Sequence, residues 1–401
     1  MVSEMVNEET IRFVRNHREE DVRALALRAK RNGDIDLPWA LDQIQGWQTA
    51  RRKLPAWAAI DDIIYPPHLS MEQCSSEQTA IYKRNIVDTL PDGSHERLID
   101  LTGGFGVDFS YLATRVRQAV YVERQERLCE IARHNFALLE LNQSTVIHAQ
   151  AEDALSHLDS DPASTLIYLD PARRDSNSAR TYAIADCTPN VLELKERLMT
   201  VAHHALIKLS PMLDWHKAIN DLGQEVEDVH IVSTGNECKE LLVLLSVHHT
   251  GSPTIHCVND GQTLTYQPSQ ETQPLQIADH DAATYLYEPN ASIMKAGCYP
   301  VLTERYAVKA VAADSHLFVS DLEVADFPGR RFAIDVITAM NKKELNRALA
   351  GITRANVATR NFPMTAQQLR QRLRLNDGGD CYIFGTTTAT GQRLVYICHK
   401  V

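Results

Sequence analysis

Between residues 98 and 248 the chain alternates short apolar runs with helical patterns, and this rhythm limits its fold more than any other feature. Helical patterns separate the first five runs, which predicts a doubly wound parallel sheet of α/β class. No helical pattern separates the last two, whose connection contains Gly235-Asn236-Glu237-Cys238, so we expect an antiparallel pair at the sheet edge. The seven runs are Leu98–Thr102, Ala119–Glu123, Ser144–His148, Thr165–Asp170, Ala205–Ser210, Asp228–Thr234 and Leu241–His248.

The segments before and after this region predict further domains. Charged residues with a helical period predict a helix from Glu9 to Arg31, ending at Asn32-Gly33, and Pro38 opens another. A helix over about residues 70–90 follows. After residue 250 we expect a hairpin turning at Asn259-Asp260-Gly261, a small mixed block over about 285–324, and alternating strands and helices from 329. The expected domains are therefore 1–70, 71–250, 251–328 and 329–401.

The net charge of −11 argues, taken alone, against a nucleic-acid partner. Its distribution changes that interpretation. Residues 329–401 contain 12 Lys/Arg and 4 Asp/Glu, a local net charge of +8, while residues 1–328 contain 29 and 48, a net charge of −19. Such asymmetry is typical of a segment that binds a polyanion, and the alternative is a solvated helix face.

Several sequence features bear on location and on metals. No apolar run approaches the roughly 18 residues of a membrane-spanning helix, and the acidic N-terminus lacks the basic and apolar regions of a signal peptide. The eight cysteines are scattered, without CxxC or Cys/His zinc spacing. We therefore expect free thiols, a reducing cytoplasm, no membrane and no metal.

The glycine-rich turn after the first apolar run predicts a nucleotide-like cofactor. Its spacing is Asp100-x-Thr102-x-Gly104-x-Gly106, and glycine lets the backbone turn back and approach a ligand closely. The nicotinamide fingerprint Gly-x-Gly-x-x-Gly fails, because Phe109 stands at its last position. The Asp-x-Gly-x-Gly-x-Gly pattern of S-adenosylmethionine (SAM) binders fits, with Thr102 in place of the first glycine.

Carboxylates after the next two strands strengthen this interpretation. Glu123 ends the second strand, where a carboxylate accepts bonds from ribose hydroxyls, and Asp153 follows the third, where it is placed to bond an adenine amino group. A helix cap is the alternative role for Asp100 or Asp153 alone. The full cofactor-binding prediction from these stretches is Asp100, Thr102, Gly103, Gly104, Gly106, Asp108, Glu123, Arg124, Asp153 and Ala154.

The fourth strand ends in Asp170-Pro171-Ala172-Arg173-Arg174, a variant of the Asp/Asn/Ser-Pro-Pro-aromatic motif of amino-nitrogen methyltransferases. In that motif the acidic or amide oxygen accepts from the N–H groups of a flipped-out base. Here the aromatic is replaced by Arg173, so Arg173 or Arg174 is expected to meet phosphate or a base edge, unless the pair forms surface salt bridges. Lys208, after the fifth strand, is a further candidate for substrate contact.

A cysteine nucleophile is an alternative for this site. Pyrimidine C5 methylation requires one. Cys238 in Asn-Glu-Cys-Lys-Glu is a candidate, but the usual Pro-Cys or Ser-Cys-Asn-Pro context is absent. An amino nitrogen is therefore the favoured acceptor.

Four stretches together resemble the bacterial class I SAM-dependent methyltransferases that end in a THUMP-like domain. The resemblance implies a helical N-terminal region, a Rossmann-like seven-stranded catalytic domain, a small ferredoxin-like insert and a THUMP-like RNA-binding end. It also implies that Glu77, Gln78 and Lys83 line the cofactor pocket, and that Thr102 is normal for the family. The stretches are Leu69–Lys83, the Asp-Leu-Thr-Gly-Gly-Phe-Gly-Val-Asp turn, Asp-Pro-Ala-Arg-Arg, and Thr359–Pro363 with Asp377–Phe384.

The expected function is methyl transfer from SAM to a base in structured RNA such as tRNA or rRNA, with Asp170 and the Pro171 turn orienting an acceptor amine. The basic C-terminal segment would grip the RNA backbone. Two alternatives stay open: a methyltransferase acting on protein or a small molecule, and a non-catalytic RNA-binding protein that keeps SAM as a structural ligand. The RNA, the base, the atom and the oligomeric state are also open.

Overall fold

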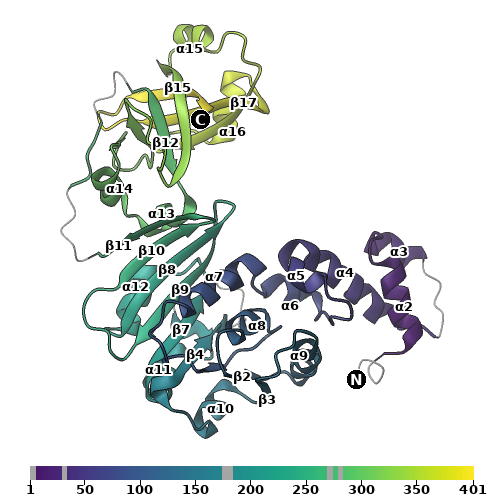
Figure 1. The fold of residues 1–401 in the computed structure, drawn as a ribbon. Coiled ribbons are helices and arrows are strands. Elements are labelled where there is room, and N and C mark those ends of the chain that lie inside the picture. Colours follow the sequence, from purple (N-terminus) through teal and green to yellow (C-terminus); the bar gives the residue numbers. More distant parts are fainter. Residues whose placement is uncertain (1–5, 29–33, 174–183, 269–273, 279–282) are drawn as a thin grey trace. The chain divides into compact units, whose positions relative to one another are not determined.

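The computed structural model describes residues 6–28, 34–173, 184–268, 274–278 and 283–401 (Figure 1). The chain divides into two compact units, and each is described by itself. The first is Met1–Glu227 with Leu242–Gly251, and the second is Asp228–Leu241 with Ser252–Val401. Arg174 and the helix end expected at Asn32-Gly33 lie outside the described residues, and so does the side chain of Arg173.

The first unit begins with helices whose ends are set by polar caps. Asn7, Asp36 and Ser76 each accept a backbone N–H at a helix start, which satisfies a donor that the helix itself leaves unpaired. The helix expected from residue 9 to 31 and the one expected over 70–90 are each broken in two. The helices are α2 (Glu8–His17), α3 (Val22–Arg28), α4 (Leu37–Lys53), α5 (Pro55–Ala58), α6 (His68–Gln73) and α7 (Glu77–Val87).

These N-terminal helices pack on the part of the chain that follows the glycine turn. Trp57 and Tyr65 share one buried cluster with Phe105, whose ring lies 4.9 Å from that of Trp57. The Asn135 side chain donates to the carbonyl of Ile64 and accepts from its N–H, both at 2.9 Å. The N-terminal helices therefore pack against the glycine turn and help to fix its position.

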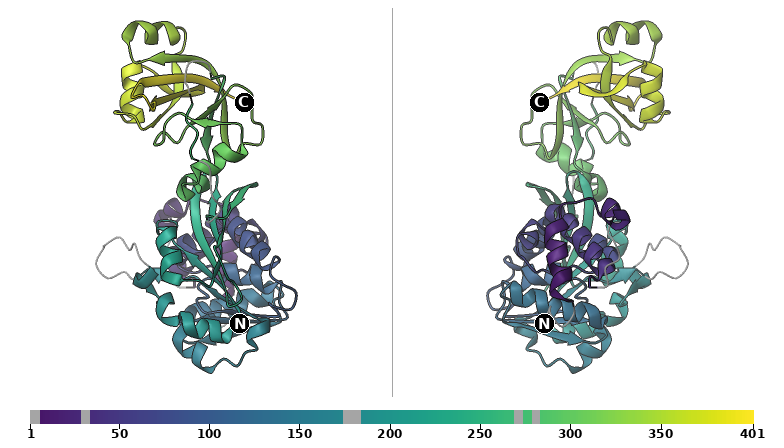
Figure 2. Two further views of the ribbon diagram at one scale, coloured as in Figure 1. Left: turned by 90° about the vertical axis from the view of Figure 1, so that its left-hand side faces the viewer. Right: turned by 90° about the vertical axis from the view of Figure 1, so that its right-hand side faces the viewer.

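A doubly wound sheet forms the centre of the first unit, as the alternation of runs predicts. Its strands β1, β2, β3, β4 and β7 pair in parallel with one another, and helices lie on either side of them (Figure 2). Buried apolar residues fill each central strand, which is typical of strands covered on both faces. The strands are β1 (Arg97–Asp100), β2 (Gln118–Glu123), β3 (Ser144–His148), β4 (Thr165–Leu169) and β7 (His204–Leu209).

Helices connect these strands and cover the sheet. α7 packs against α8, while α10 and α12 both pack against α11. A short antiparallel pair, β5 (Ala172–Arg173) with β6 (Cys187–Thr188), follows the Asp-Pro turn. The helices are α8 (Val107–Ala113), α9 (Glu126–Leu138), α10 (Ala151–His157), α11 (Val191–Val201) and α12 (Trp215–Leu222), with short 3-10 turns at Pro162–Ser164 and Ile184–Asp186.

The last two strands of the predicted set form a hairpin, β8 (Val226–Thr234) and β9 (Glu237–Ser246), but their expected edge position is wrong. The sheet has nine strands in the order β11-β10-β8-β9-β7-β4-β1-β2-β3. β10 (Thr254–Asn259) pairs in parallel with β8, and β11 (Gln262–Tyr266) pairs with β10. The hairpin expected at Asn259-Asp260-Gly261 is confirmed. It extends the sheet, because β10 pairs with the edge of β8 that β9 does not occupy.

The second unit contains a separate seven-stranded sheet in the order β13-β14-β12-β15-β18-β17-β16. The small block and the basic segment share it, since β12 pairs with both β14 and β15. Phe332, Phe384 and Tyr396 are among the buried residues of its core. Its strands are β12 (Tyr285–Pro289), β13 (Lys309–Ala310), β14 (Phe318–Ser320), β15 (Gly329–Ala339), β16 (Arg354–Arg360), β17 (Asn376–Thr387) and β18 (Arg393–Lys400).

Four helices accompany this sheet: α13 (Ala291–Ala296), α14 (Tyr299–Arg305), α15 (Lys342–Ala348) and α16 (Ala366–Leu373). The strands and helices expected from residue 329 onward are confirmed. Thr365 and Gln368 form a reciprocal capping box that fixes the start of α16. Among all described residues, none of the helices has the length and apolarity needed to cross a membrane.

Candidate active site

The glycine turn between β1 and α8 is tightly constrained. Gly104 has φ +56° and Gly106 has φ +84°, both in the left-handed region that favours glycine. At Gly103 the constraint is steric, because an added Cβ would lie 2.2 Å from Cε2 of Tyr121. Thr102, Gly103 and Gly104 are partly exposed. The turn is therefore a cradle of accessible backbone, which suits a ligand that must approach the main chain closely.

Two carboxylates frame this cradle. Glu123, at the end of β2, accepts the Gly104 N–H at 2.9 Å through one oxygen and the Gln125 N–H at 2.8 Å through the other. Asp100, at the end of β1, is 1% exposed and accepts the Thr102 N–H at 2.9 Å. Burial raises the pKa of Asp100 well above its ordinary value, and the neighbouring carboxylates add to the rise. This anionic surrounding suits a cationic ligand.

Thr102 joins the glycine turn to the Asp-Pro turn at the end of β4. Its hydroxyl accepts the Asp170 N–H at 2.6 Å and lies 3.5 Å from the Asp100 carboxylate, to which it donates. A glycine at this position, as in the common SAM pattern, could make neither bond. The threonine therefore fixes the two sequence-predicted turns against each other.

The Asp170 carboxylate also has a charged partner, since its Oδ2 lies 2.6 Å from Nζ of Lys208. The Lys208 side chain is 12% exposed, whereas that of Asp170 is 35% exposed. The same ammonium lies 3.9 Å from the Asp108 carboxylate. The Asp170 carboxylate is therefore held by Lys208 and is partly exposed to solvent.

Asp108, in the first turn of α8, is the centre of a buried polar network beneath these turns. Its carboxylate accepts from the hydroxyls of Ser75 and Tyr168, each at 2.7 Å, and lies 3.1 Å from Nζ of the fully buried Lys83. Burial alone would raise the pKa of Asp108, but Lys83, Lys208 and the two hydroxyls lower it below its ordinary value. Asp108 is therefore an ionised, buried carboxylate that holds the surrounding side chains of the network in place.

Two of the predicted cofactor residues belong to this network. Lys83 is fully buried and the Asp108 side chain is 9% exposed, and their place in the lining of a cofactor pocket stays a prediction. Ser75 and Tyr168 were not predicted. Tyr168 lies inside an apolar run, and nothing in the run itself distinguishes a tyrosine that bonds a carboxylate from one that only packs.

Other predicted cofactor residues lie at the ends of neighbouring elements. Arg124 and Asp153 are exposed, the first after β2 and the second in the first turn of α10, and Ala154 beside it is buried. Gln78 is exposed on α7, whereas the Glu77 carboxylate accepts the Ala56 N–H at 2.8 Å. Glu77 therefore tethers α5, and its predicted role in a pocket stays a prediction.

Cys238 lacks the environment of a nucleophile. It stands at the start of β9, and burial is the largest of the effects that raise the pKa of its thiol. A catalytic cysteine needs an accessible thiolate, for which a lowered pKa is required. All eight cysteines are free, as expected.

Comparison with known proteins finds matches to the C-terminal part of the chain and to the whole chain. The ferredoxin-like domain family matches residues 285–328, and the THUMP domain-like family matches residues 329–400. A crystal structure of a protein from Porphyromonas gingivalis W83, described as a "putative methyltransferase", matches with a TM-score of 0.84 and 29% identity. The match covers 99% of each chain. No protein with a curated description matches.

Smaller structures match only part of the chain. A Streptococcus mutans protein, described as a "putative methyltransferase" in complex with SAH, is 14% identical with a TM-score of 0.32, covering 41% of this chain and 95% of its own. A Clostridium thermocellum protein, described as a "putative rRNA-methylase", is 15% identical with a TM-score of 0.31, covering 42% and 95%. The assignment of the fold rests instead on the full-length match and on the strand order. The chain therefore has the architecture of a class I methyltransferase, followed by domains of the ferredoxin-like and THUMP domain-like families.

Proposed function

We propose that this protein transfers a methyl group from SAM to an amino nitrogen of a base in structured RNA, with tRNA or rRNA as the substrate class. The observation that carries the proposal is the 2.6 Å bond from the Asp170 N–H to the Thr102 hydroxyl. This bond fixes the proposed cofactor-binding turn next to the Asp170 carboxylate, which can accept a hydrogen bond from an acceptor amine. Positioning two reactants in this way is itself a large part of the catalysis of group transfer.

The enzyme class is that of SAM-dependent methyltransferases, and the cofactor is SAM. The residues that would hold it are the Thr102–Gly104 backbone, Glu123 and Asp100. The fit rests on charge as well as shape, because the turn lies between the Asp100 and Glu123 carboxylates, and a bound sulfonium cation would favour the ionised form of Asp100 that burial disfavours. When bound, SAM supplies an electrophilic methyl group, and no metal is required.

Asp170 is the proposed contact for the acceptor amine. A bound SAM would supply the methyl group, and an acceptor nitrogen that gains it would have to give up one proton. An accessible carboxylate can accept the N–H bond and that proton. Lys208 donates to Oδ2 of Asp170 at 2.6 Å, which holds this carboxylate in one orientation. Arg173 and Arg174 remain the proposed contacts for the nucleotide.

The RNA-binding role rests on the exposed cations of the THUMP-like segment. Four of its arginines form ion pairs with carboxylates, in the pairs Arg330–Glu288, Arg331–Glu323, Arg360–Glu288 and Arg370–Asp377. Among the described residues no carboxylate oxygen lies within 4.0 Å of the other eight cations, all of them exposed. They are Lys342, Lys343, Arg347, Arg354, Arg372, Arg374, Arg393 and Lys400. Exposed cations without local counter-charges are suited to phosphates.

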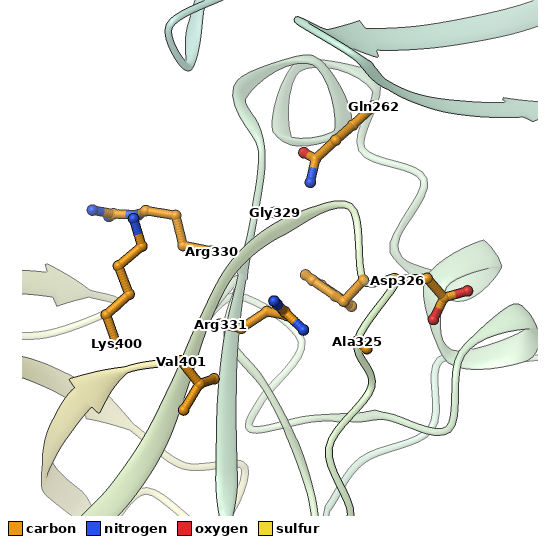
Figure 3. Close-up of a pocket in the computed structure, with 9 residues that line it drawn as sticks. Gln262, Ala325, Asp326, Gly329, Arg330, Arg331, Lys400 and Val401 are labelled. Carbon is orange, nitrogen blue, oxygen red and sulfur yellow. The ribbon is translucent and has the colours of Figure 1, made fainter.

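A pocket of about 360 Å³ in the second unit adds a candidate contact for the RNA backbone. Its lining includes Arg330, Arg331, Lys400 and Gln262, together with one carboxylate, Asp326 (Figure 3). The Lys400 ammonium and the Gln262 amide suit a phosphodiester, which takes several hydrogen bonds at once, and Arg330 and Arg331 add positive charge that Glu288 and Glu323 partly balance. We assign this pocket to RNA binding and the cradle of the first unit to the cofactor.

Calorimetry with SAM tests the cofactor half of the proposal. The wild-type chain is expected to bind SAM, and the Asp100→Ala and Glu123→Ala variants to bind it at least tenfold more weakly. Lys217→Ala, which changes an exposed ion pair of α12, is the matched control and should bind like the wild type. Unchanged affinity in both cradle variants would refute the assignment of the cradle.

A further inference from the structure

One face of β8 and β10 brings together three side chains that are ligands for transition metals. Asp228 and His230 are two residues apart on β8, so they lie on the same face of the sheet. His256 on β10 stands opposite His230 in the register of this parallel pair. One potential ligand atom from each residue lies within 4.8 Å of the other two. All three residues belong to the second unit and are separate from the cofactor cradle.

One distance within this cluster is close to that between two ligand atoms of a metal site. His256 Nε2 lies 3.3 Å from Asp228 Oδ1. Ligand atoms at about 2.0–2.2 Å from a tetrahedral Zn²⁺ are about 3.3 Å apart, so this pair already has the separation that the ion requires. The imidazole rings of His230 and His256 stack at 4.4 Å with an interplanar angle of 10°. Binding a common ion requires these rings to rotate out of their parallel stack.

A neighbouring strand supplies the outer contact that metal-binding histidines commonly have. Thr265 on β11 stands opposite His256, and its hydroxyl lies 3.2 Å from Nδ1 of that ring. A bond at Nδ1 fixes the orientation of the ring and leaves Nε2 directed at Asp228. The environment is also sheltered: His230 is 5% exposed, and the side chains of Asp228 and His256 are 23% and 24% exposed. Partial exposure of two ligands leaves a path for an ion and a water molecule.

We propose that Asp228, His230 and His256 bind one divalent transition metal ion of the Zn²⁺ type. Two imidazoles and one carboxylate form a common ligand set for this class of ion, with water completing the coordination. The ion links β8 to β10, two strands joined by a connection that passes through β9, and so stabilises this part of the nine-stranded sheet. No cysteine or histidine spacing along the chain predicts this site, because its ligands meet only through the register of the strands.

The test uses the full-length chain, stripped with a chelator and titrated with ZnCl₂ alone. Calorimetry is expected to show one Zn²⁺ per chain, and Co²⁺ in its place is expected to give visible absorption bands of a four- or five-coordinate site. Asp228→Asn and His256→Asn should each weaken Zn²⁺ binding at least tenfold. Thr265→Val, which leaves all three ligands in place, should weaken it less than either.

A second histidine pair provides the control for Zn²⁺ binding that depends on histidine content alone. In the first unit, His248 Nε2 lies 3.1 Å from His203 Nδ1, and among the described residues no ion pair joins either ring to a carboxylate. The H203N/H248N double variant should bind Zn²⁺ like the wild type. Zn²⁺ should also raise the unfolding temperature of the wild type and of this control, but not of Asp228→Asn. The proposal is overturned if the wild type binds no stoichiometric Zn²⁺. Equal binding by the wild type and both ligand variants, or loss of binding in the histidine-pair control, also overturns it.

Discussion

At the scale of single residues, the structure shows why threonine stands where a glycine is usual. Thr102 bonds Asp100 on one side and the Asp170 backbone on the other. The sequence could predict that Asp100 and Asp170 lie near each other, because both end parallel strands at the same edge of a sheet. It could not predict Lys83 as the partner of Asp108, because that contact depends on how α7 packs on α8.

The buried Lys83–Asp108 pair is expected to be necessary for stability. Replacing Lys83 by Met leaves a buried carboxylate short of one counter-charge, which should lower the free energy of unfolding by about 3 kcal/mol. Urea denaturation measures this. Lys217→Met breaks an exposed pair with Asp221 and should cost about 1 kcal/mol or less. Equal costs for the two variants would contradict the structural role of Lys83.

Asp100 should make the cofactor-free protein less stable at high pH. Its folded-state pKa is raised by burial, so between the unfolded and the folded pKa the folded state binds more protons than the unfolded state. The contribution of Asp100 to stability is therefore present below the unfolded pKa and lost as pH rises through the folded pKa.

The Asp100→Asn variant has no ionisable group at this position, so it does not lose stability as pH rises. Its side-chain amide keeps an oxygen that can accept the Thr102 N–H. The variant should unfold at a higher temperature than the wild type at pH 8, and the difference between the two should shrink towards pH 5. Thermal unfolding monitored by circular dichroism at both values measures this. Parallel pH profiles for the two proteins would show that Asp100 is not the titrating group.

At the scale of elements, the pattern of apolar runs is the sequence feature that predicts the structure most accurately. The predicted runs each form a strand, and the hairpin between β10 and β11 lies where Asp260-Gly261 was expected to turn. The interior position of β8, between β10 and β9, could not be predicted, because the residues after 250 carry no signal of the strand that they join. Helix breaks were missed at Arg18–Asp21 and Cys74–Ser76, where neither Gly nor Pro interrupts the pattern.

The glycine turn offers a prediction about one element. Gly103→Ala should displace the Tyr121 ring and destabilise the protein by about 1–3 kcal/mol, with loss of SAM binding. Gly261→Ala is the matched control, because nothing lies within 4 Å of an added Cβ there and its φ is not in the left-handed region. Thermal unfolding and SAM calorimetry measure both effects. A stable Gly103→Ala variant with wild-type affinity would exclude the turn as the cofactor cradle.

At the scale of the whole molecule, the charge asymmetry now has a structural location. The excess of Lys and Arg belongs to the domain that matches the THUMP domain-like family, while the acidic majority includes the catalytic fold. Composition alone predicted a polyanion-binding segment. It could not predict that β12 of the ferredoxin-like domain and β15 of the THUMP-like domain share one sheet, because strand pairing is not encoded in charge.

RNA affinity should depend steeply on salt through this segment. The triple variant Lys342→Gln, Lys343→Gln and Arg347→Gln removes three exposed cations of α15 and should reduce the slope of log affinity against log salt by up to about 3. Filter binding of tRNA at several salt concentrations measures the slope. Lys217→Gln on α12 should leave it unchanged. An equal slope for the triple variant and the wild type would move the RNA-binding surface away from α15.

The most direct test of the central claim is transfer of a labelled methyl group from SAM to RNA extracted from cells, followed by mass spectrometry of the nucleosides. We expect one methylated nucleoside carrying the label on an exocyclic amino nitrogen. Asp170→Ala, a variant that should still bind SAM, is expected to give at least a hundredfold less product. Label that appears only in protein or small molecules, or equal transfer by Asp170→Ala, would contradict the account.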